Sequence, residues 1–274
     1  MNRTIKLTLL LFSLGSIQPG LEAQDQTWNK IDEGLEMGEF ASPVPSVLGE
    51  SVITIIRIDP GRYSFRLLCC DELGHSKLTA VEWTWKYNLV GAVNAGMFLS
   101  DHKTNVGYMK NFEYLNNPKI NSSYHSVVAF NPVDTVQDPF EIFDIDETDI
   151  QDISAKYHTV IQNLRLIKSP GQNRWSQQDR KWSELALGQD KHGNALLIFS
   201  RSPYSMHDLN NILISLPIDI DNAQHLEGGP EASLYISHQG TRVENMGSYE
   251  SGFNENDQIL DFWPIPNVIG IVRK

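Results

Sequence analysis

The segment His225-Leu-Glu-Gly-Gly-Pro-Glu-Ala-Ser233 follows an apolar run that begins at Ile220. Paired glycines after a short apolar run predict a strand that ends in a tight turn, where the backbone takes positive φ or another group comes close. Side chains at a strand end often face a pocket, so Glu227 and Glu231 are candidates for chemistry. The alternative is a hairpin turn that carries two solvated carboxylates.

A second segment, Gly91-Ala-Val-Asn-Ala-Gly-Met-Phe98, also combines a short apolar run with a polar residue and a glycine. Residues 89–93 predict a buried strand, and Asn94 stands at its end before Gly96. An asparagine amide donates and accepts hydrogen bonds at once, which suits it to such a place. The two segments are most informative when they are taken together.

Together they resemble motifs of the phosphodiester glycosidase family. That family includes the animal lysosomal enzyme that removes N-acetylglucosamine from a phosphodiester on mannose, and many bacterial envelope proteins labelled as exopolysaccharide-related. The resemblance runs from about Ser51 to the C-terminus. The family's Asn-Gly-Gly-Phe-Phe-like block matches residues 94–98, and a following glycine matches Gly107. Its Leu-Asp-Gly-Gly-Gly-Ser block is present with Glu227 in place of the aspartate and Glu231 in place of the final small hydroxyl residue.

Three further blocks of the family are present in altered form. Residues 183–188 approximate an Arg-Thr-Ala-Ile-Gly-like block without its arginine, although Arg180 lies just upstream. Residues 199–209 resemble a strand, a Gly-Arg pair and a helix, in which Arg201 takes the arginine position and a serine replaces the glycine. Residues 264–270 resemble the terminal strand. The order and spacing of all these blocks indicate membership of the family.

The resemblance implies hydrolysis of a sugar-1-phosphodiester at the anomeric carbon, which needs a carboxylate near that carbon and donors for the phosphate. Glu227 is then the expected catalytic carboxylate, as base for water or as support for an oxocarbenium-like centre. Arg201 is expected to meet the phosphate, and Asn94 to bind sugar hydroxyls or orient water. The expected substrate-binding residues are Arg57, Gly96, Phe98, Gly107, His207, Gly228, Gly229 and Glu231.

Several of these assignments have alternatives. Arg57 lies in an apolar strand and needs a partner, which Asp59 can supply structurally. His207 and His225 flank the motifs, where a lone histidine is more often structural or exposed. The N–H groups of the paired glycines can form an anion nest. No Ser-His-Asp, His-Glu-x-x-His or P-loop signature is present, so the sequence demands neither a metal nor a cofactor.

A second function class fits the same scaffold, namely a catalytically silent protein that binds carbohydrate or assists envelope assembly. The departure at Glu231 and the missing arginine near Ser183 favour it. Aromatic side chains such as Tyr204, Trp182 or Trp263 would then line the pocket.

The chain has 274 residues, of which 41% are hydrophobic, enough for one large domain or two small ones. Its net charge of −12 argues against a nucleic-acid partner and against anionic membranes. A sugar-phosphate or glycan substrate remains compatible with this charge, because the local field of the pocket acts on a small ligand. The sequence leaves the oligomeric state open.

Residues 1–23 have the form of a signal peptide. Arg3 and Lys6 give a positively charged start before the apolar core 7–14. This core is too short to span a bilayer, and a cleavage site follows Ala23. A buried N-terminal helix is the alternative. No later apolar run approaches the roughly 18 residues of a membrane helix. We therefore expect an exported protein, periplasmic or extracellular, without an integral membrane segment in the mature chain.

The predicted fold class is α+β, as a single domain with a mixed or antiparallel β-sheet packed against a few helices. Strand-like segments outnumber helical ones and do not alternate with them strictly. Residues 24–50 form an N-terminal segment, as a short helix or a sheet edge, and residues 51–274 form the glycosidase-like domain. Within it, residues 51–58 and 63–70 predict a β-hairpin around a turn signal at 59–62.

Two helices are predicted at residues 76–87 and 205–216, each capped by its first serine. Residues 100–124 predict a long polar loop, either a lid or a plain surface excursion. The acidic run 144–152 lacks the glycine and the spacing of a calcium loop, so it predicts a solvated helix start.

The chain has two cysteines, Cys69 and Cys70, and they are adjacent. In an exported protein they can form a strained vicinal disulfide. The alternative is that both are buried as small hydrophobic residues.

Overall fold

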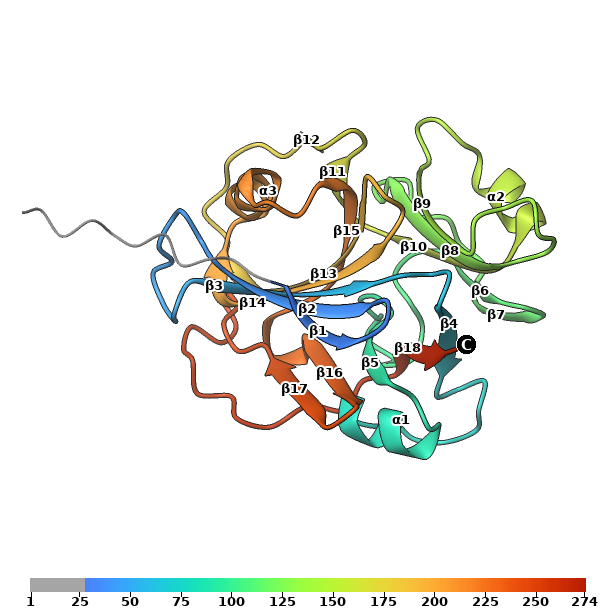
Figure 1. Cartoon of the computed structure of the whole chain (residues 1–274), viewed down its shortest axis with the longest axis horizontal. Coiled ribbons are helices and arrows are strands. Elements are labelled where there is room, and N and C mark those ends of the chain that lie inside the picture. The colour runs from blue at the N-terminus through green and yellow to red at the C-terminus, as the bar shows by residue number, and fades with distance from the viewer. Residues whose placement is uncertain (1–27) are drawn as a thin grey trace, which may run out of the picture.

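The computed structural model describes residues 28–274, which form three antiparallel β-sheets with three α-helices around them (Figure 1). The predicted signal peptide 1–23 therefore lies outside the described residues. The largest sheet has eight strands, which in spatial order are β1 (Asn29–Asp32), β2 (Leu35–Ala41), β3 (Val52–Ile58), β14 (Ala195–Tyr204), β13 (Trp182–Asp190), β15 (Ile220–Gly228), β11 (Arg165–Lys168) and β12 (Gln172–Asn173).

Two smaller sheets have five strands each. One contains, in spatial order, β7 (Tyr114–Asn117), β6 (Met109–Asn111), β10 (Tyr157–Asn163), β8 (Ser126–Pro132) and β9 (Phe140–Asp144). The other contains β17 (Thr241–Met246), β16 (Ser233–His238), β5 (Gly91–Asn94), β18 (Asn267–Arg273) and β4 (Tyr63–Cys69). The helices are α1 (Ala80–Lys86), α2 (Ile150–Lys156) and α3 (Met206–Ser215), and a 3₁₀ turn η1 covers Gly229–Glu231.

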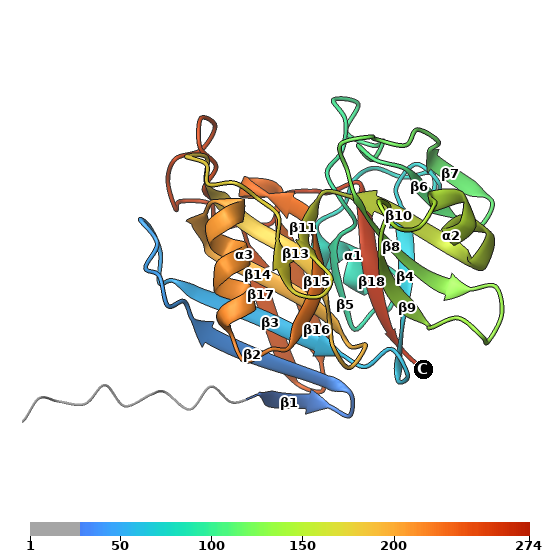
Figure 2. The ribbon, with the colours of Figure 1, turned by 90° about the horizontal axis from the view of Figure 1, so that it is seen from above.

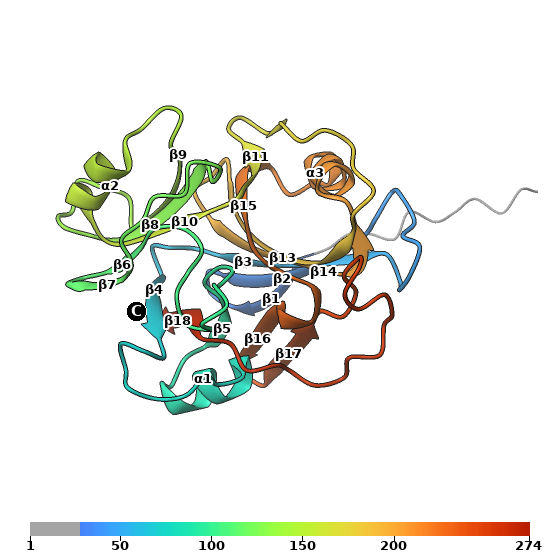
Figure 3. The same cartoon turned by 180° about the vertical axis from the view of Figure 1, so that it is seen from behind.

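The large sheet is covered on both faces. α3 lies along one face, while β16, β17 and the strands beside them lie against the other (Figures 1 and 2). Seen from behind, the sheet of β8–β10 with α2 stands at one end of the large sheet, and α1 lies below β5 and β16 (Figure 3). All three sheets contribute to the central core, for example through Leu197, Val93 and Phe130. The α+β prediction is thus confirmed, and every strand pairing is antiparallel.

α3 forms where the sequence predicted a helix. The Ser205 side chain accepts a hydrogen bond from the Asp208 N–H at 3.1 Å and caps the first turn. Leu209, Ile212 and Leu213 recur at helical spacing and are fully or almost fully buried against the large sheet. Each such side chain contributes about 1.5–3 kcal/mol through burial.

The first helix is shorter than predicted. Thr79, and not Ser76, caps α1, because the Thr79 Oγ1 accepts from the Glu82 N–H while Glu82 accepts from the Thr79 N–H. This reciprocal capping box satisfies two free N–H groups. Ser76 cannot form such a box, because the residue three positions later is Thr79 and not a glutamate or a glutamine. The acidic run does precede a helix, since Asp149 caps α2.

The predicted hairpin of residues 51–58 and 63–70 is wrong. Both strands exist, but β3 pairs with β2 and β14, while β4 pairs with β18. The turn at Asp59 reverses the chain and passes it from one sheet to another. A turn signal fixes a local reversal, whereas the pairing partner of a fully buried strand is decided by distant segments.

Three further segments are now defined. Residues 29–41 form the edge strand β1 and its neighbour β2, which settles the sheet-edge alternative for the N-terminal segment. The polar segment 100–124 is not one loop, because it carries the short strands β6 and β7. Cys69 and Cys70 are both free and buried, which settles the hydrophobic alternative. Among residues 28–274, no helix has the length and apolar character needed to span a membrane.

Candidate active site

A cavity of about 410 Å³ opens at the end of β15, where the strand passes into η1. Its walls come from segments that are far apart in the sequence, including the start of β13, the start of α3 and the loop after β17. The lining residues are Met97, Phe98, Val106, Tyr124, Leu164, Arg180, Trp182, Met206, His225, Glu227, Gly228, Glu231 and Glu250.

The two glycines after Glu227 allow β15 to end in the wall of the cavity without a clash. A Cβ on Gly228 would lie 2.7 Å from the Trp182 ring, so a larger residue would push that ring away. Gly229 has φ +62°, a conformation in which a side chain is strained, and a Cβ there would approach Glu250. The predicted strand followed by a glycine turn is therefore present, but β15 and β16 belong to different sheets and do not form a hairpin.

Glu227 is a buried carboxyl group on the cavity wall, with 8% of the residue exposed. Burial raises its pKa to about 8, and nearby Glu231 and Glu184 add to this rise. His225 and a 3.1 Å hydrogen bond from the Gly228 N–H act in the opposite direction without cancelling it. At neutral pH most Glu227 side chains consequently hold a proton, which they can donate.

His225 forms a buried pair with Glu184. Its Nδ1 lies 2.6 Å from Glu184 Oε1, and the two side chains are 4% and 2% exposed. The other carboxyl oxygen of Glu184, Oε2, accepts a hydrogen bond from the Trp182 Nε1–H at 2.7 Å. Burial opposes a charge on the imidazole, yet the Glu184 carboxylate outweighs it and raises the pKa of His225.

The second imidazole nitrogen of His225 is left for a ligand. Nε2 has no hydrogen-bond partner within residues 28–274, although the ring lines the cavity. With Nδ1 held by Glu184, a protonated ring presents Nε2–H as a donor. Burial raises the pKa of Glu184 as well, and Nε2 carries a hydrogen whichever partner holds the shared proton. The pair thereby supplies the cavity with a buried N–H donor.

The rest of the wall combines carboxylates with aromatic rings. Burial raises the pKa of Glu231, and Glu250 adds to the rise. Arg180 is exposed at the cavity and can reach a ligand. Phe98 and Tyr124 join Trp182 as aromatic lining, which suits the apolar face of a sugar ring.

Four of the predicted catalytic and substrate-binding residues line this cavity, namely Glu227, Glu231, Phe98 and Gly228. Of the aromatic residues expected under the binding alternative, Trp182 lines it, whereas Tyr204 and Trp263 do not. Asn94 lies behind it with 1% of the residue exposed. Its Nδ2 donates to the Glu231 carbonyl oxygen at 3.1 Å, and its Oδ1 accepts from the Ser233 N–H at 2.8 Å. Asn94 therefore holds the turn that carries Glu231.

The structure places both predicted arginines away from the cavity lining. Arg201 Nε lies 2.6 Å from Asp257 Oδ1, and its terminal nitrogens donate to backbone carbonyls such as that of Ile259. Arg57 pairs with Glu36, and not with Asp59, at the β2–β3 edge. Its guanidinium also stacks on a tryptophan ring at 3.9 Å.

The other predicted residues act as neighbours of the site or as packing positions. His207 lies in the first turn of α3, where Nδ1 is 2.6 Å from the Trp175 carbonyl oxygen. A Cβ on Gly96 would lie 2.4 Å from Asn163 Oδ1, and one on Gly107 would lie 2.5 Å from a backbone oxygen. Both glycines therefore permit close packing behind the cavity.

Sequence reasoning missed the Glu184–His225 pair and the contributions of Tyr124, Met206 and Glu250. A signal was available for the pair, because Glu184 and His225 each interrupt an apolar strand and are 41 residues apart. A buried charge predicts a partner, but only the β13–β15 register shows which one it is. Among residues 28–274, no group of three or more His, Cys, Asp or Glu side chains is arranged to hold a metal ion.

The antiparallel α+β fold holds a cavity lined by carboxylates and aromatic rings, the kinds of side chain that glycosidases use. The family follows from a direct match. The chain belongs to the phosphodiester glycosidase family, whose model matches residues 87–272. This confirms the resemblance found in the sequence and supports a glycosidase-type role.

Three solved structures share the fold at low sequence identity. The catalytic domain of zebrafish N-acetylglucosamine-1-phosphodiester alpha-N-acetylglucosaminidase, auto-inhibited by its pro-peptide, has a TM-score of 0.62 at 15% identity over 90% of this chain and 86% of that one. A hypothetical protein from Synechocystis has a TM-score of 0.60 at 13% identity, over 88% of this chain and 62% of that one. A presumed exported protein from Burkholderia pseudomallei K96243 has a TM-score of 0.50 at 10% identity, over 81% and 74%. A search of curated proteins finds no match in sequence.

Proposed function

We propose that this protein is a hydrolase that cleaves the bond between the anomeric carbon and the phosphate of a glycosyl-1-phosphodiester. The observation that carries the proposal is Glu227, a buried carboxyl group with a pKa of about 8 at the wall of the cavity in a member of this family. A carboxylic acid that stays protonated near neutral pH is the usual general acid of glycosidases.

In this reaction Glu227 gives its proton to the phosphate oxygen as the bond to the anomeric carbon breaks. Water adds to that carbon and loses a proton to Glu231, so that a free sugar and a phosphate monoester are formed. The raised pKa of Glu227 favours this acid role over the role of base that the sequence suggested. Asn94 supports the chemistry indirectly, because it holds the Glu231 turn.

Two groups donate hydrogen bonds to the phosphate. His225 offers Nε2–H from within the wall, and the Arg180 guanidinium offers a planar fork from the exposed side. Trp182, Phe98 and Tyr124 offer faces for the sugar ring. The substrate would come from envelope or host glycans, in keeping with export directed by residues 1–23 to the periplasm or beyond.

A second candidate function is carbohydrate binding without turnover, in exopolysaccharide or envelope assembly. The aromatic lining around Trp182 favours it, because stacked rings hold sugars whether or not a bond is cleaved. The presence of Glu231 where the family has a small hydroxyl residue also favours it.

The test is turnover of a panel of sugar-1-phosphodiesters by the mature protein, beside Glu227→Gln. Free sugar should be released by the parent and reduced by about 10²- to 10⁴-fold in the variant. Glu39→Gln is the matched control, since Glu39 is exposed on β2 and its change should leave turnover intact. Full activity of Glu227→Gln would remove the role given to Glu227. Absence of turnover by the parent, together with binding on a sugar array, would favour the second candidate.

A further inference from the structure

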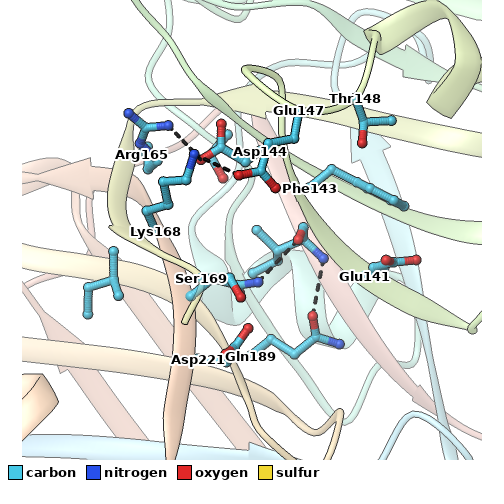
Figure 4. A pocket seen from close by; sticks show the side chains of 14 residues that line it. Glu141, Phe143, Asp144, Glu147, Thr148, Arg165, Lys168, Ser169, Gln189 and Asp221 are labelled. Carbon is cyan, nitrogen blue, oxygen red and sulfur yellow. Dashed lines mark hydrogen bonds and ion pairs between the residues drawn. The ribbon is translucent and has the colours of Figure 1, made fainter. Parts of the chain in front are cut away.

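A second polar cavity, of about 320 Å³, lies near the beginning of β15 and is unsuited to phosphate (Figure 4). Its two cations already have partners, because Arg165 Nη1 lies 2.5 Å from Asp144 Oδ2 and Lys168 Nζ lies 2.8 Å from Glu147 Oε1. A bound anion would have to break these pairs. Further donors for a phosphate are therefore expected at the other end of β15, in the cavity that holds Glu227.

Tyr124 lines that cavity, and its hydroxyl group is uncommitted. The hydroxyl group makes no hydrogen bond within residues 28–274, yet it is not one of the unpartnered polar atoms that the described part of the chain shields from solvent. A phenol O–H is a good hydrogen-bond donor. The Tyr124 hydroxyl group is consequently free to meet a ligand in the cavity.

The backbone that carries Tyr124 is held by Gln162, which is fully buried near the end of β10. Gln162 Nε2 donates to the Asn121 carbonyl oxygen at 2.8 Å and to the Tyr124 carbonyl oxygen at 2.6 Å. Gln162 Oε1 accepts from the Asn121 N–H at 2.9 Å. Because a buried amide fixes residues 121–124 at three points, Tyr124 enters the cavity from a well-defined support.

The same stretch of chain holds His225, whose N–H donates to the Leu164 carbonyl oxygen at 2.8 Å, two residues beyond Gln162. Burial raises the pKa of Tyr124, and the charge of nearby Glu227 adds to this rise. The phenol therefore keeps its proton at neutral pH. The Tyr124 O–H and the His225 Nε2–H are thus two donors on neighbouring supports, close to the carboxyl group that serves as the acid.

We propose that Tyr124 is a further catalytic residue, whose O–H donates a hydrogen bond to a non-bridging phosphate oxygen of the substrate. This role rests on the proposed hydrolysis, in which Glu227 gives its proton to the bridging oxygen of the same phosphate. Negative charge grows on the phosphate as its bond to the anomeric carbon breaks, so a fixed donor beside it stabilises the leaving group. With His225, Tyr124 makes the cavity selective for a sugar with an anomeric phosphate over the free sugar.

Tyr124→Phe tests the hydroxyl group alone, because the ring that faces the sugar is kept. The probes are N-acetylglucosamine 1-phosphate and N-acetylglucosamine, which differ only in the phosphate, and calorimetric titration measures both affinities. The parent should prefer the phosphorylated probe. Tyr124→Phe should weaken binding of that probe by about 10- to 100-fold and leave the affinity for the free sugar unchanged.

Tyr108→Phe is the matched control. The Tyr108 hydroxyl group also makes no hydrogen bond within residues 28–274, but its ring packs beside α2 and does not line the cavity. This variant should keep both affinities. Equal binding of the two probes by the parent, or an unchanged preference in Tyr124→Phe, would overturn the role given to Tyr124.

Turnover of the sugar-1-phosphodiester panel separates this role from the hydrolysis itself. Tyr124→Phe should lower kcat/KM by at least about tenfold, whereas Tyr108→Phe should not change it. A parent without turnover, whose preference for the phosphate is lost in Tyr124→Phe, would refute the hydrolase and retain Tyr124 as a phosphate ligand. An active parent, whose preference and kcat/KM are unchanged in Tyr124→Phe, would retain the hydrolase and refute Tyr124.

Discussion

The two ends of β15 carry polar cavities of similar size and opposite character. At the end of the strand, His225 and Glu184 are 4% and 2% exposed, and burial raises the pKa of Glu227 to about 8. At the beginning, Arg165 is 15% exposed and pairs with Asp144, which is 10% exposed, and with Asp146, which is 44% exposed. At the end of β15, burial therefore shifts the pKa values of ionisable side chains. At its beginning, the charges are balanced by ion pairs and screened by solvent. The following changes test this contrast.

Glu184→Gln should have the largest effect. It leaves the buried His225 imidazole without its carboxylate, and breaking one side of a buried pair costs about 3–5 kcal/mol. The loss should be greatest near pH 5, where the unfolded imidazole is protonated, and smaller above pH 7, where a glutamine can accept from a neutral ring. Urea unfolding at both pH values measures it.

Glu36→Gln is the matched control for that change. It breaks the Arg57–Glu36 pair, whose side chains are 26% and 33% exposed, and should cost at most about 1 kcal/mol. If Glu184→Gln cost no more than this control at pH 5, Glu184 and His225 would not form the ion pair described above.

The next effect concerns the pH dependence of stability. The pKa of Glu227 is about 8 in the folded protein, against a usual value of 4.5. Between pH 4.5 and about 8, the folded state therefore holds a proton that the unfolded state has released. Its stabilising contribution is complete below pH 4.5 and is lost as the pH rises to about 8. The total is a few kcal/mol, since one pKa unit corresponds to about 1.4 kcal/mol.

Comparison of the parent with Glu227→Gln isolates this contribution. The raised pKa of His225 shifts stability in the same direction, and Glu184 maintains most of this rise in both proteins. The part of the rise that Glu227 contributes is lost in the variant, which changes the difference between the two proteins in the same direction. The difference in unfolding free energy between parent and variant should therefore change between pH 5 and pH 8.5, in favour of the variant at the higher pH. A difference that stays constant would place the Glu227 pKa outside this range.

Sequence patterns predicted local features well. The glycine turn after Glu227 and the Ser205 cap depend on neighbouring residues, and both are present. The pairing of strands and charges was harder to predict. Arg201 has the spacing expected of a phosphate ligand, but the loop at 257–259, more than fifty residues later, supplies its partners.

The same reason explains why most of the residues that line the candidate site were missed. Glu184 and His225 meet only because β13 and β15 pair in one register, and Glu250 joins them from a loop beyond β17. Local patterns identify a residue that needs a partner, whereas the fold selects that partner.

Arg165→Met should have the smallest effect. The methionine keeps an apolar stem in place and removes a partly exposed charge, so the expected loss is about 1 kcal/mol and should shrink in high salt. Arg62→Met, which breaks a pair with 49% and 57% exposed side chains, is the control and should cost close to nothing. Unfolding at low and high salt measures both. A loss as large as that of Glu184→Gln would mean that the two ends of β15 are held by the same kind of buried pair.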